Sequence, residues 1–91
     1  KRREAEFRKQ VAPLKKALEK HEKAMDKCSD ELKTLEASLS DTSLYNDDKK
    51  AELMQLLDKQ AKLTQELEEE EMQWLDAQEQ MEAQRASYEA Q

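Results

Sequence analysis

Apolar residues recur with alternating spacings of three and four along most of this chain. In the first half the pattern continues for four heptads, and every member except His21 and Cys28 is aliphatic, aromatic or methionine. An apolar seam of this length requires a partner helix to cover it. The predicted seam residues of the first half are Phe7, Val11, Leu14, Leu18, His21, Met25, Cys28, Leu32, Leu35 and Leu39.

The second half has the same spacing with more polar interruptions. Its apolar face is broadened by Leu57, Ala61 and Leu75, and the pattern fades after Gln84. The predicted seam residues of the second half are Leu53, Leu56, Gln60, Leu63, Leu67, Glu70, Trp74, Ala77, Met81, Gln84 and Tyr88.

The stretch LSDTSLYNDD, residues 39–48, separates the two tracts. Its short polar side chains compete for backbone hydrogen bonds, which favours caps and turns over helix interiors. A connection of about eight residues is short, so the two helices are expected to lie antiparallel and side by side. We expect Leu44 and Tyr45, the apolar residues of this turn, to fold over the open end of the seam.

We therefore predict an all-α fold: a two-helix antiparallel coiled-coil hairpin with a helical N-terminal lead-in. Because Pro13 removes a backbone donor and clashes with the preceding turn, the main helix is expected to begin near Ala12. Residues 1–11 are predicted to be a lead-in helix or linker from a preceding domain. The hairpin is predicted at 12–86, with helices at about 12–40 and 48–86 and a turn at 41–47. A frayed tail is expected at 87–91.

The composition excludes most catalytic designs. Charged residues make up 42% of the chain and aromatic residues 4%, which is typical of long amphipathic helices without an enclosed pocket. The absence of glycine excludes a phosphate-binding loop, and one His and one Cys are too few for a metal site. His21 and Cys28 are seven residues apart, about 10.5 Å along a helix, so they do not form a nucleophile–base pair. We expect no catalytic, cofactor or metal residue, no membrane span, and a cytoplasmic protein.

Charge is distributed unevenly along the chain. Residues 1–27 carry ten Lys or Arg against five Asp or Glu, whereas residues 49–91 carry five against eleven. In an antiparallel hairpin the basic half of the first helix lies beside the acidic half of the second, so we expect the acidic run at 66–71 to be solvated and to pair with first-helix lysines. Two registers keep the seams in phase, one with His21 opposite Leu67 and the other with His21 opposite Trp74.

A row of lysines suggests a contact with nucleic acid. Heptad counting places five of them opposite the seam, and Arg8 adds charge near the base of the hairpin. Ammonium groups on a rigid arm can follow a phosphate backbone without reading bases. The alternatives are an ordinary solvated face, or contact with a protein or a second copy through Leu57, Met72 and Leu75. The five candidate phosphate contacts are Lys9, Lys16, Lys20, Lys23 and Lys27.

Three segments, KRREAEFRK…PLKK, LEASLSDTSLYNDDKKAELMQLL and LEEEEMQWLDAQEQME, together resemble the C-terminal domain of ABC-F proteins, the two-cassette ABC ATPases without a membrane domain. In that family an antiparallel hairpin has a turn of the form Leu-x-Asp-x-x-Leu/Phe-Tyr and a second helix with an acidic stretch leading into Trp-Leu. At Thr42 many members have proline. The matching residues here are Leu39, Asp41, Leu44, Tyr45, Trp74 and Leu75.

The resemblance implies a parent protein that is a cytoplasmic ATPase acting on ribosomes. This hairpin would then be a contact arm for ribosomal RNA or DNA, following the preceding ABC cassettes. ATP would be the cofactor of the parent, and the chain itself would have no ATPase activity. Valyl-tRNA synthetase ends in a similar hairpin, but the Phe and Ala-Pro elements of its turn are missing here.

Overall fold

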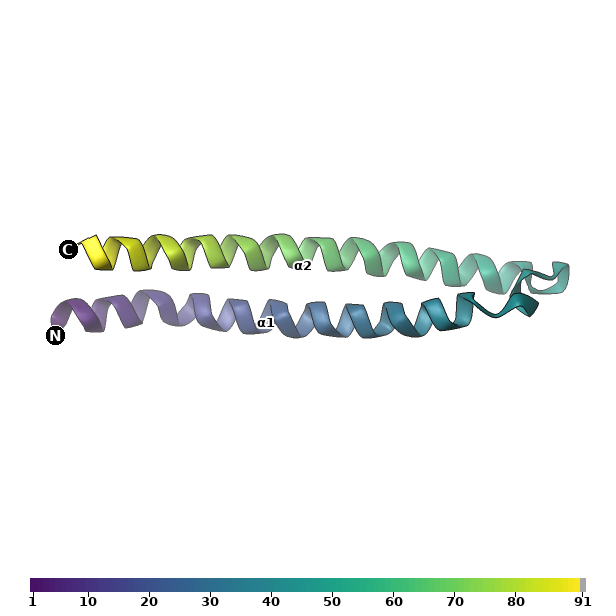
Figure 1. Ribbon diagram of the computed structural model, residues 1–91, viewed down its shortest axis with the longest axis horizontal. Coiled ribbons are helices and arrows are strands. Elements are labelled where there is room, and N and C mark those ends of the chain that lie inside the picture. The colour runs from purple at the N-terminus through teal and green to yellow at the C-terminus, as the bar shows by residue number, and fades with distance from the viewer. Residues whose placement is uncertain (91) are drawn as a thin grey trace.

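The computed structural model describes residues 1–90 and is a long helical hairpin (Figure 1). Helix α1 (Arg2–Leu39) is followed by two short 3₁₀ segments, η1 (Thr42–Tyr45) and η2 (Asp47–Lys49), and by helix α2 (Lys50–Ala90). The two long helices lie side by side over a molecule that measures 68 × 15 × 14 Å. The predicted all-α hairpin is confirmed.

The interface between α1 and α2 follows the heptad pattern. All predicted seam positions of both helices are buried or half-buried. The central cluster consists of Cys28, Leu35 and Leu63, with Leu32, Leu56 and Leu67 packed against it. Nearer the termini, Val11, Ala77 and Met81 are also buried. Because the hairpin has only two layers, this single seam supplies most of its apolar burial.

Side-chain contacts across the seam show how the two helices lie relative to each other. His21 contacts Glu70, with Nδ1 2.5 Å from Oε2, whereas Phe7 stacks on Tyr88, the pairing expected in the register with His21 opposite Trp74. His21 and Glu70 are each 24 residues from the middle of the turn, counted from Tyr45 and Asn46 respectively. Phe7 and Tyr88 are 38 and 42 residues from the same two points, so the contacts across the seam do not all join residues that are equally far from the turn.

Helix α1 is continuous through Pro13 and does not begin near Ala12 as expected. Proline in a helix interior costs about 3 kcal/mol relative to alanine, so the first turns need tertiary support. They receive it from α2. Val11 is only 4% exposed, and the ring of Phe7 stacks on that of Tyr88 with centroids 4.4 Å apart.

The Phe7–Tyr88 stack also bears on the C-terminal end of the hairpin. Helix α2 continues to Ala90, whereas a frayed tail was expected over 87–91. Tyr88 is half-buried against α1, and this contact holds the last turns in place. Gln91 lies outside the described residues.

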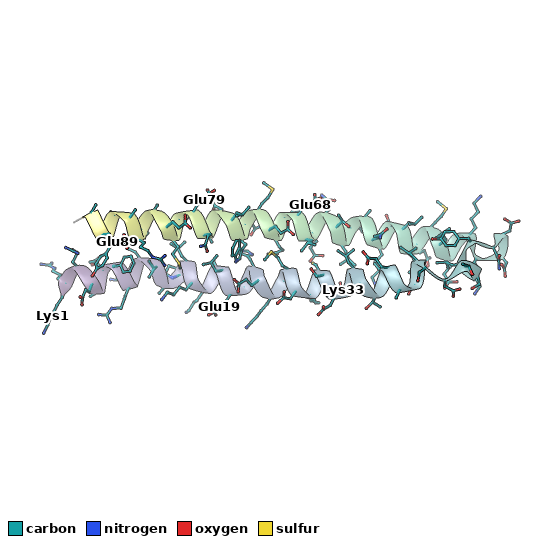
Figure 2. The ribbon with its side chains drawn as sticks, viewed as in Figure 1. Lys1, Glu19, Lys33, Glu68, Glu79 and Glu89 are labelled. Atoms are coloured by element: carbon teal, nitrogen blue, oxygen red, sulfur yellow. The ribbon has the colours of Figure 1, made fainter. Side chains whose placement is uncertain are left out.

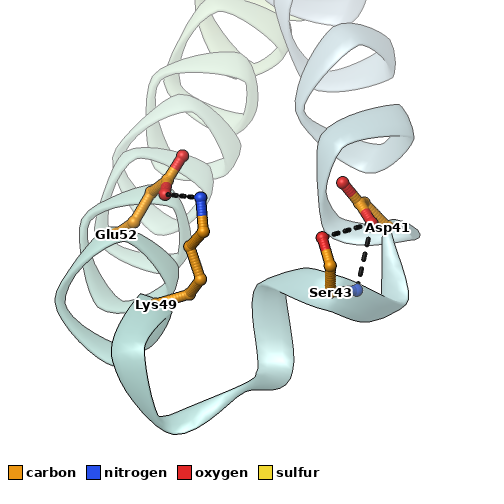
Figure 3. A network of polar contacts seen from close by, with 4 residues as sticks. All are labelled: Asp41, Ser43, Lys49 and Glu52. Atoms are coloured by element: carbon orange, nitrogen blue, oxygen red, sulfur yellow. Dashed lines mark hydrogen bonds and ion pairs between the residues drawn. The ribbon is translucent and has the colours of Figure 1, made fainter.

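Figure 3 shows the tip, where the chain reverses. None of the described residues there has a positive φ. Asp41 caps η1, and its Oδ1 accepts hydrogen bonds from the Ser43 backbone N–H at 3.0 Å and the Ser43 hydroxyl at 2.8 Å. Leu44 is buried, as expected. Tyr45 differs from expectation because its ring is mostly exposed: the hydroxyl donates to the carbonyl of Leu39 at 2.8 Å and so satisfies an unpaired helix-end acceptor.

Candidate nucleic-acid contact face

The five candidate lysines form one row on the outer side of α1, here called the basic stripe (Lys9, Lys16, Lys20, Lys23 and Lys27). All five are exposed. Each comes two residues after a seam residue, which corresponds to a rotation of about 200° around the helix. Since the seam faces α2, the basic stripe points away from α2 and into solvent.

The ammonium groups of the basic stripe have no carboxylate partner within residues 1–90. None of the five lysines takes part in the ion pairs Lys49–Glu52 at 3.6 Å and Lys62–Asp58 at 3.0 Å, or in the contact between His21 and Glu70. The positive charge of the stripe is therefore not neutralised by the acidic residues of α2.

Arg8 lies beside the basic stripe rather than on it. It is exposed, and it follows the seam residue Phe7 by one position, which places it about 100° around the helix from the seam. Together with Glu4, Phe7 and Tyr88 it borders a shallow hollow near the termini.

The base of the hairpin contains an aromatic and cationic cluster that the sequence reasoning did not identify. The guanidinium of Arg3 lies over the ring of Tyr88, 4.7 Å from its centroid, and Phe7 stacks on the same ring. The sequence pattern did place Phe7 and Tyr88 at the outermost seam positions. Those positions alone could have predicted that the two rings meet. Cation–π and stacking contacts of this kind close the seam at its open end.

Two polar contacts cross the seam near its middle. His21 meets Glu70, and the indole Nε1–H of Trp74 donates to Glu22 Oε1 at 3.1 Å. The acidic run at 66–71 was expected to pair with lysines of the first helix. Instead, Glu70 turns inward to His21, and the other glutamates of the run are exposed.

Cys28 is buried in the central cluster. Burial, reinforced by the nearby negative charges of Glu66, Glu31 and Glu70, raises the pKa of its thiol above the ordinary value of 9.0. The thiol is thus a protonated core group rather than a nucleophile.

In the described part of the chain, no group of three or more His, Cys, Asp or Glu side chains is arranged to hold a metal ion. None of the helices that the structure describes has an apolar stretch long enough to cross a bilayer.

Large apolar side chains on α2 lie outside the seam. Leu57, Met72 and Leu75, which the sequence marked as a second apolar strip, are all exposed, and Met54 is exposed as well. The structure therefore separates a basic outer face on α1 from an acidic outer face on α2 that also carries apolar groups.

Comparison with known proteins identifies the family. Residues 10–79 match the family model described as ABC transporter C-terminal domain. The chain is 49% identical over 82 residues to "Probable ATP-binding protein YheS" of Escherichia coli K12 and to the protein of the same name from Escherichia coli O6:H1 strain CFT073. The match covers 90% of this chain and 13% of each relative. No solved structure matches.

These matches confirm the resemblance to the C-terminal domain of ABC-F ATPases. The matched model describes a C-terminal domain rather than a nucleotide-binding cassette, which fits a non-catalytic chain. The chain therefore belongs to the ABC transporter C-terminal domain family.

Proposed function

We propose that this hairpin is a non-catalytic arm that contacts nucleic acid through the basic stripe of α1. The observation that carries the proposal is the stripe itself: five exposed lysines on one face of a straight helix, none of them paired with a carboxylate within residues 1–90. Such a row supplies phosphate contacts that are independent of sequence.

The spacing of the lysines suits a phosphate backbone. From Lys9 to Lys27 the stripe spans 18 residues, or about 27 Å at about 1.5 Å per residue. If each lysine neutralises one phosphate, the logarithm of the binding constant should fall with the logarithm of the salt concentration with a slope of about −4 to −5.

The charge on α2 restricts how the arm approaches nucleic acid. Glu66, Glu68, Glu69 and Glu71 are exposed on α2 and would repel phosphates. The arm therefore binds with α1 toward the nucleic acid and α2 away from it. Net acidity of the whole chain and a basic contact face are compatible because the two charges lie on different helices.

The family gives this arm its setting. We infer that the parent is a cytoplasmic ABC-F ATPase whose cassettes bind ATP and precede the hairpin, and that the nucleic acid is ribosomal RNA or another structured nucleic acid. The relatives are named as ATP-binding proteins, and the ribosome as a partner is an expectation from the resemblance to ABC-F proteins.

The test is fluorescence anisotropy of a labelled RNA hairpin and a labelled DNA duplex titrated with this chain at low and moderate salt. The wild-type chain should bind with the steep salt dependence given above. The combined variant Lys16→Glu, Lys20→Glu and Lys23→Glu should lose binding, because it places negative charge in the middle of the stripe.

A matched control variant changes the net charge of the chain by the same amount, but at lysines outside the basic stripe. Lys33→Glu, Lys49→Glu and Lys59→Glu together alter three exposed lysines outside the stripe and should leave most of the binding intact. Equal losses in the two triple variants would show that only net charge matters. Absence of binding by the wild-type chain at low salt would overturn the proposal.

A further inference from the structure

Four large exposed apolar side chains of α2 lie along one side of the helix. Together with Ala61 and Glu68 on the same side, they are here called the outer strip (Met54, Leu57, Ala61, Glu68, Met72 and Leu75). All six are exposed. Figure 2 shows Glu68, and Glu79 further along, on the side of α2 that faces away from α1. The outer strip is thus free of intramolecular cover, and its methionine and leucine side chains form two patches. Met54 and Leu57 lie near the tip, and Met72 and Leu75 lie nearer the termini.

The two apolar patches of the outer strip are spaced symmetrically along α2. Met54 and Leu57 are three residues apart, and so are Met72 and Leu75. The midpoint between the two patches falls between Thr64 and Gln65. A second α2 that runs antiparallel about this midpoint would place Met54 over Leu75 of the second copy and Leu57 over Met72 of the second copy.

Charge favours the same arrangement. Residues 49–62 carry four lysines against two acids, whereas residues 66–82 carry eight acids and no base. Antiparallel pairing of two α2 helices places the first segment of each copy against the second segment of the other. Parallel pairing would instead place the two acidic segments together, which is unfavourable.

We propose that the outer strip binds a second copy of this chain, with the two α2 helices antiparallel and a two-fold axis between Thr64 and Gln65. Such an interface is self-complementary, as two-fold symmetry requires. Lys50 of one copy faces Glu79 of the other at both ends of the contact. The basic stripes of both copies remain on the outside, so the dimer presents two nucleic-acid contact faces.

Sedimentation velocity of this chain over a range of concentrations tests the interface. The wild-type chain should form dimers, and Leu57→Glu with Met72→Glu should weaken dimerisation by at least about tenfold. The control, Gln55→Glu with Gln73→Glu, adds the same charge at exposed positions off the outer strip and should dimerise normally. Circular dichroism verifies that each variant stays helical.

The orientation is tested by crosslinking in a Cys28→Ala background. Gln65→Cys lies beside the proposed two-fold axis and should form a disulfide between copies, whereas Gln55→Cys should not. Wild-type chains that sediment as monomers at every concentration would overturn the proposal, and so would a Leu57→Glu, Met72→Glu variant that dimerises as well as the wild type.

The salt dependence distinguishes this contact from nucleic-acid binding. Association through the apolar patches should persist as salt rises, because the exposed Lys50–Glu79 pairs at its ends add little to the affinity, while phosphate contacts weaken. The lysine triple variant of α1 should retain normal dimerisation, so failure of one proposal leaves the other intact. Dimers that dissociate at moderate salt would contradict an interface built on the outer strip.

Discussion

Asp41 shows how a single side chain replaces glycine in the turn. Its carboxylate accepts two hydrogen bonds from Ser43, one from the hydroxyl and one from the backbone N–H. These bonds hold the first 3₁₀ turn with ordinary negative φ angles. They favour the charged form of the carboxyl and lower its pKa below the ordinary value of 3.8.

The lowered pKa of Asp41 predicts a specific pH dependence. Because the folded state favours the carboxylate, Asp41 contributes stability above pH 3.8 that is lost as the pH falls through its lower folded-state value. Asp41→Asn keeps an acceptor oxygen but no charge. Its thermal midpoint should be lower than that of the wild type at neutral pH, and the difference should shrink in acid. A difference that is constant with pH, measured by circular dichroism, would contradict this role.

Helix α1 shows where local sequence rules give way to packing. Pro13 predicted a helix start near Ala12, yet the helix continues back to Arg2. Rules based on local sequence account for the backbone donor that Pro13 lacks. They do not account for the contacts that Phe7 and Val11 make with α2, which is distant in sequence. The seam pattern itself was predictable, because heptad spacing directly reports which side of each helix is buried.

Replacing Pro13 with alanine tests whether this residue is a helix interior position. In the interior, Pro13→Ala restores a backbone hydrogen bond to the carbonyl of Lys9 and should raise the free energy of unfolding by about 1–3 kcal/mol. At a helix start the same change would be neutral or unfavourable. Urea denaturation monitored by circular dichroism measures the difference, and a loss of stability would place the helix start at Pro13.

The central cluster should dominate the stability of the hairpin. Leu35 is 4% exposed and belongs to the same cluster as Cys28 and Leu63. Leu35→Ala should lower the free energy of unfolding by about 2–5 kcal/mol, because it removes buried methyl groups and leaves a cavity. Gln55→Ala, an exposed position on α2, should change it by less than about 0.5 kcal/mol. Similar effects of both changes in urea denaturation would mean that the seam is not tightly packed.

At the scale of the whole molecule, the sequence predicted the hairpin, the row of lysines and the apolar residues outside the seam, but it left the register open. Heptads repeat, so a seam alone fits several registers that differ by one turn. In the structure a short turn joins the helices, and a polar contact between His21 and Glu70 lies within the seam. A polar pair inside an apolar seam is a known means of specifying register, at some cost in stability.

The native cysteine allows the register to be measured directly. Cys28 and Leu63 are each 17 residues from the middle of the turn and share the central cluster. Leu63→Cys should therefore form a disulfide with Cys28 under mild oxidation. The two registers predicted from the sequence would instead bring Gln60 or Leu67 opposite Cys28. Gln60→Cys and Leu67→Cys should crosslink poorly, since a disulfide tolerates little displacement of the two Cα atoms.

Mass spectrometry at low protein concentration separates these intramolecular bonds from crosslinked dimers. A higher yield for Gln60→Cys or Leu67→Cys than for Leu63→Cys would show that the hairpin adopts one of the shifted registers.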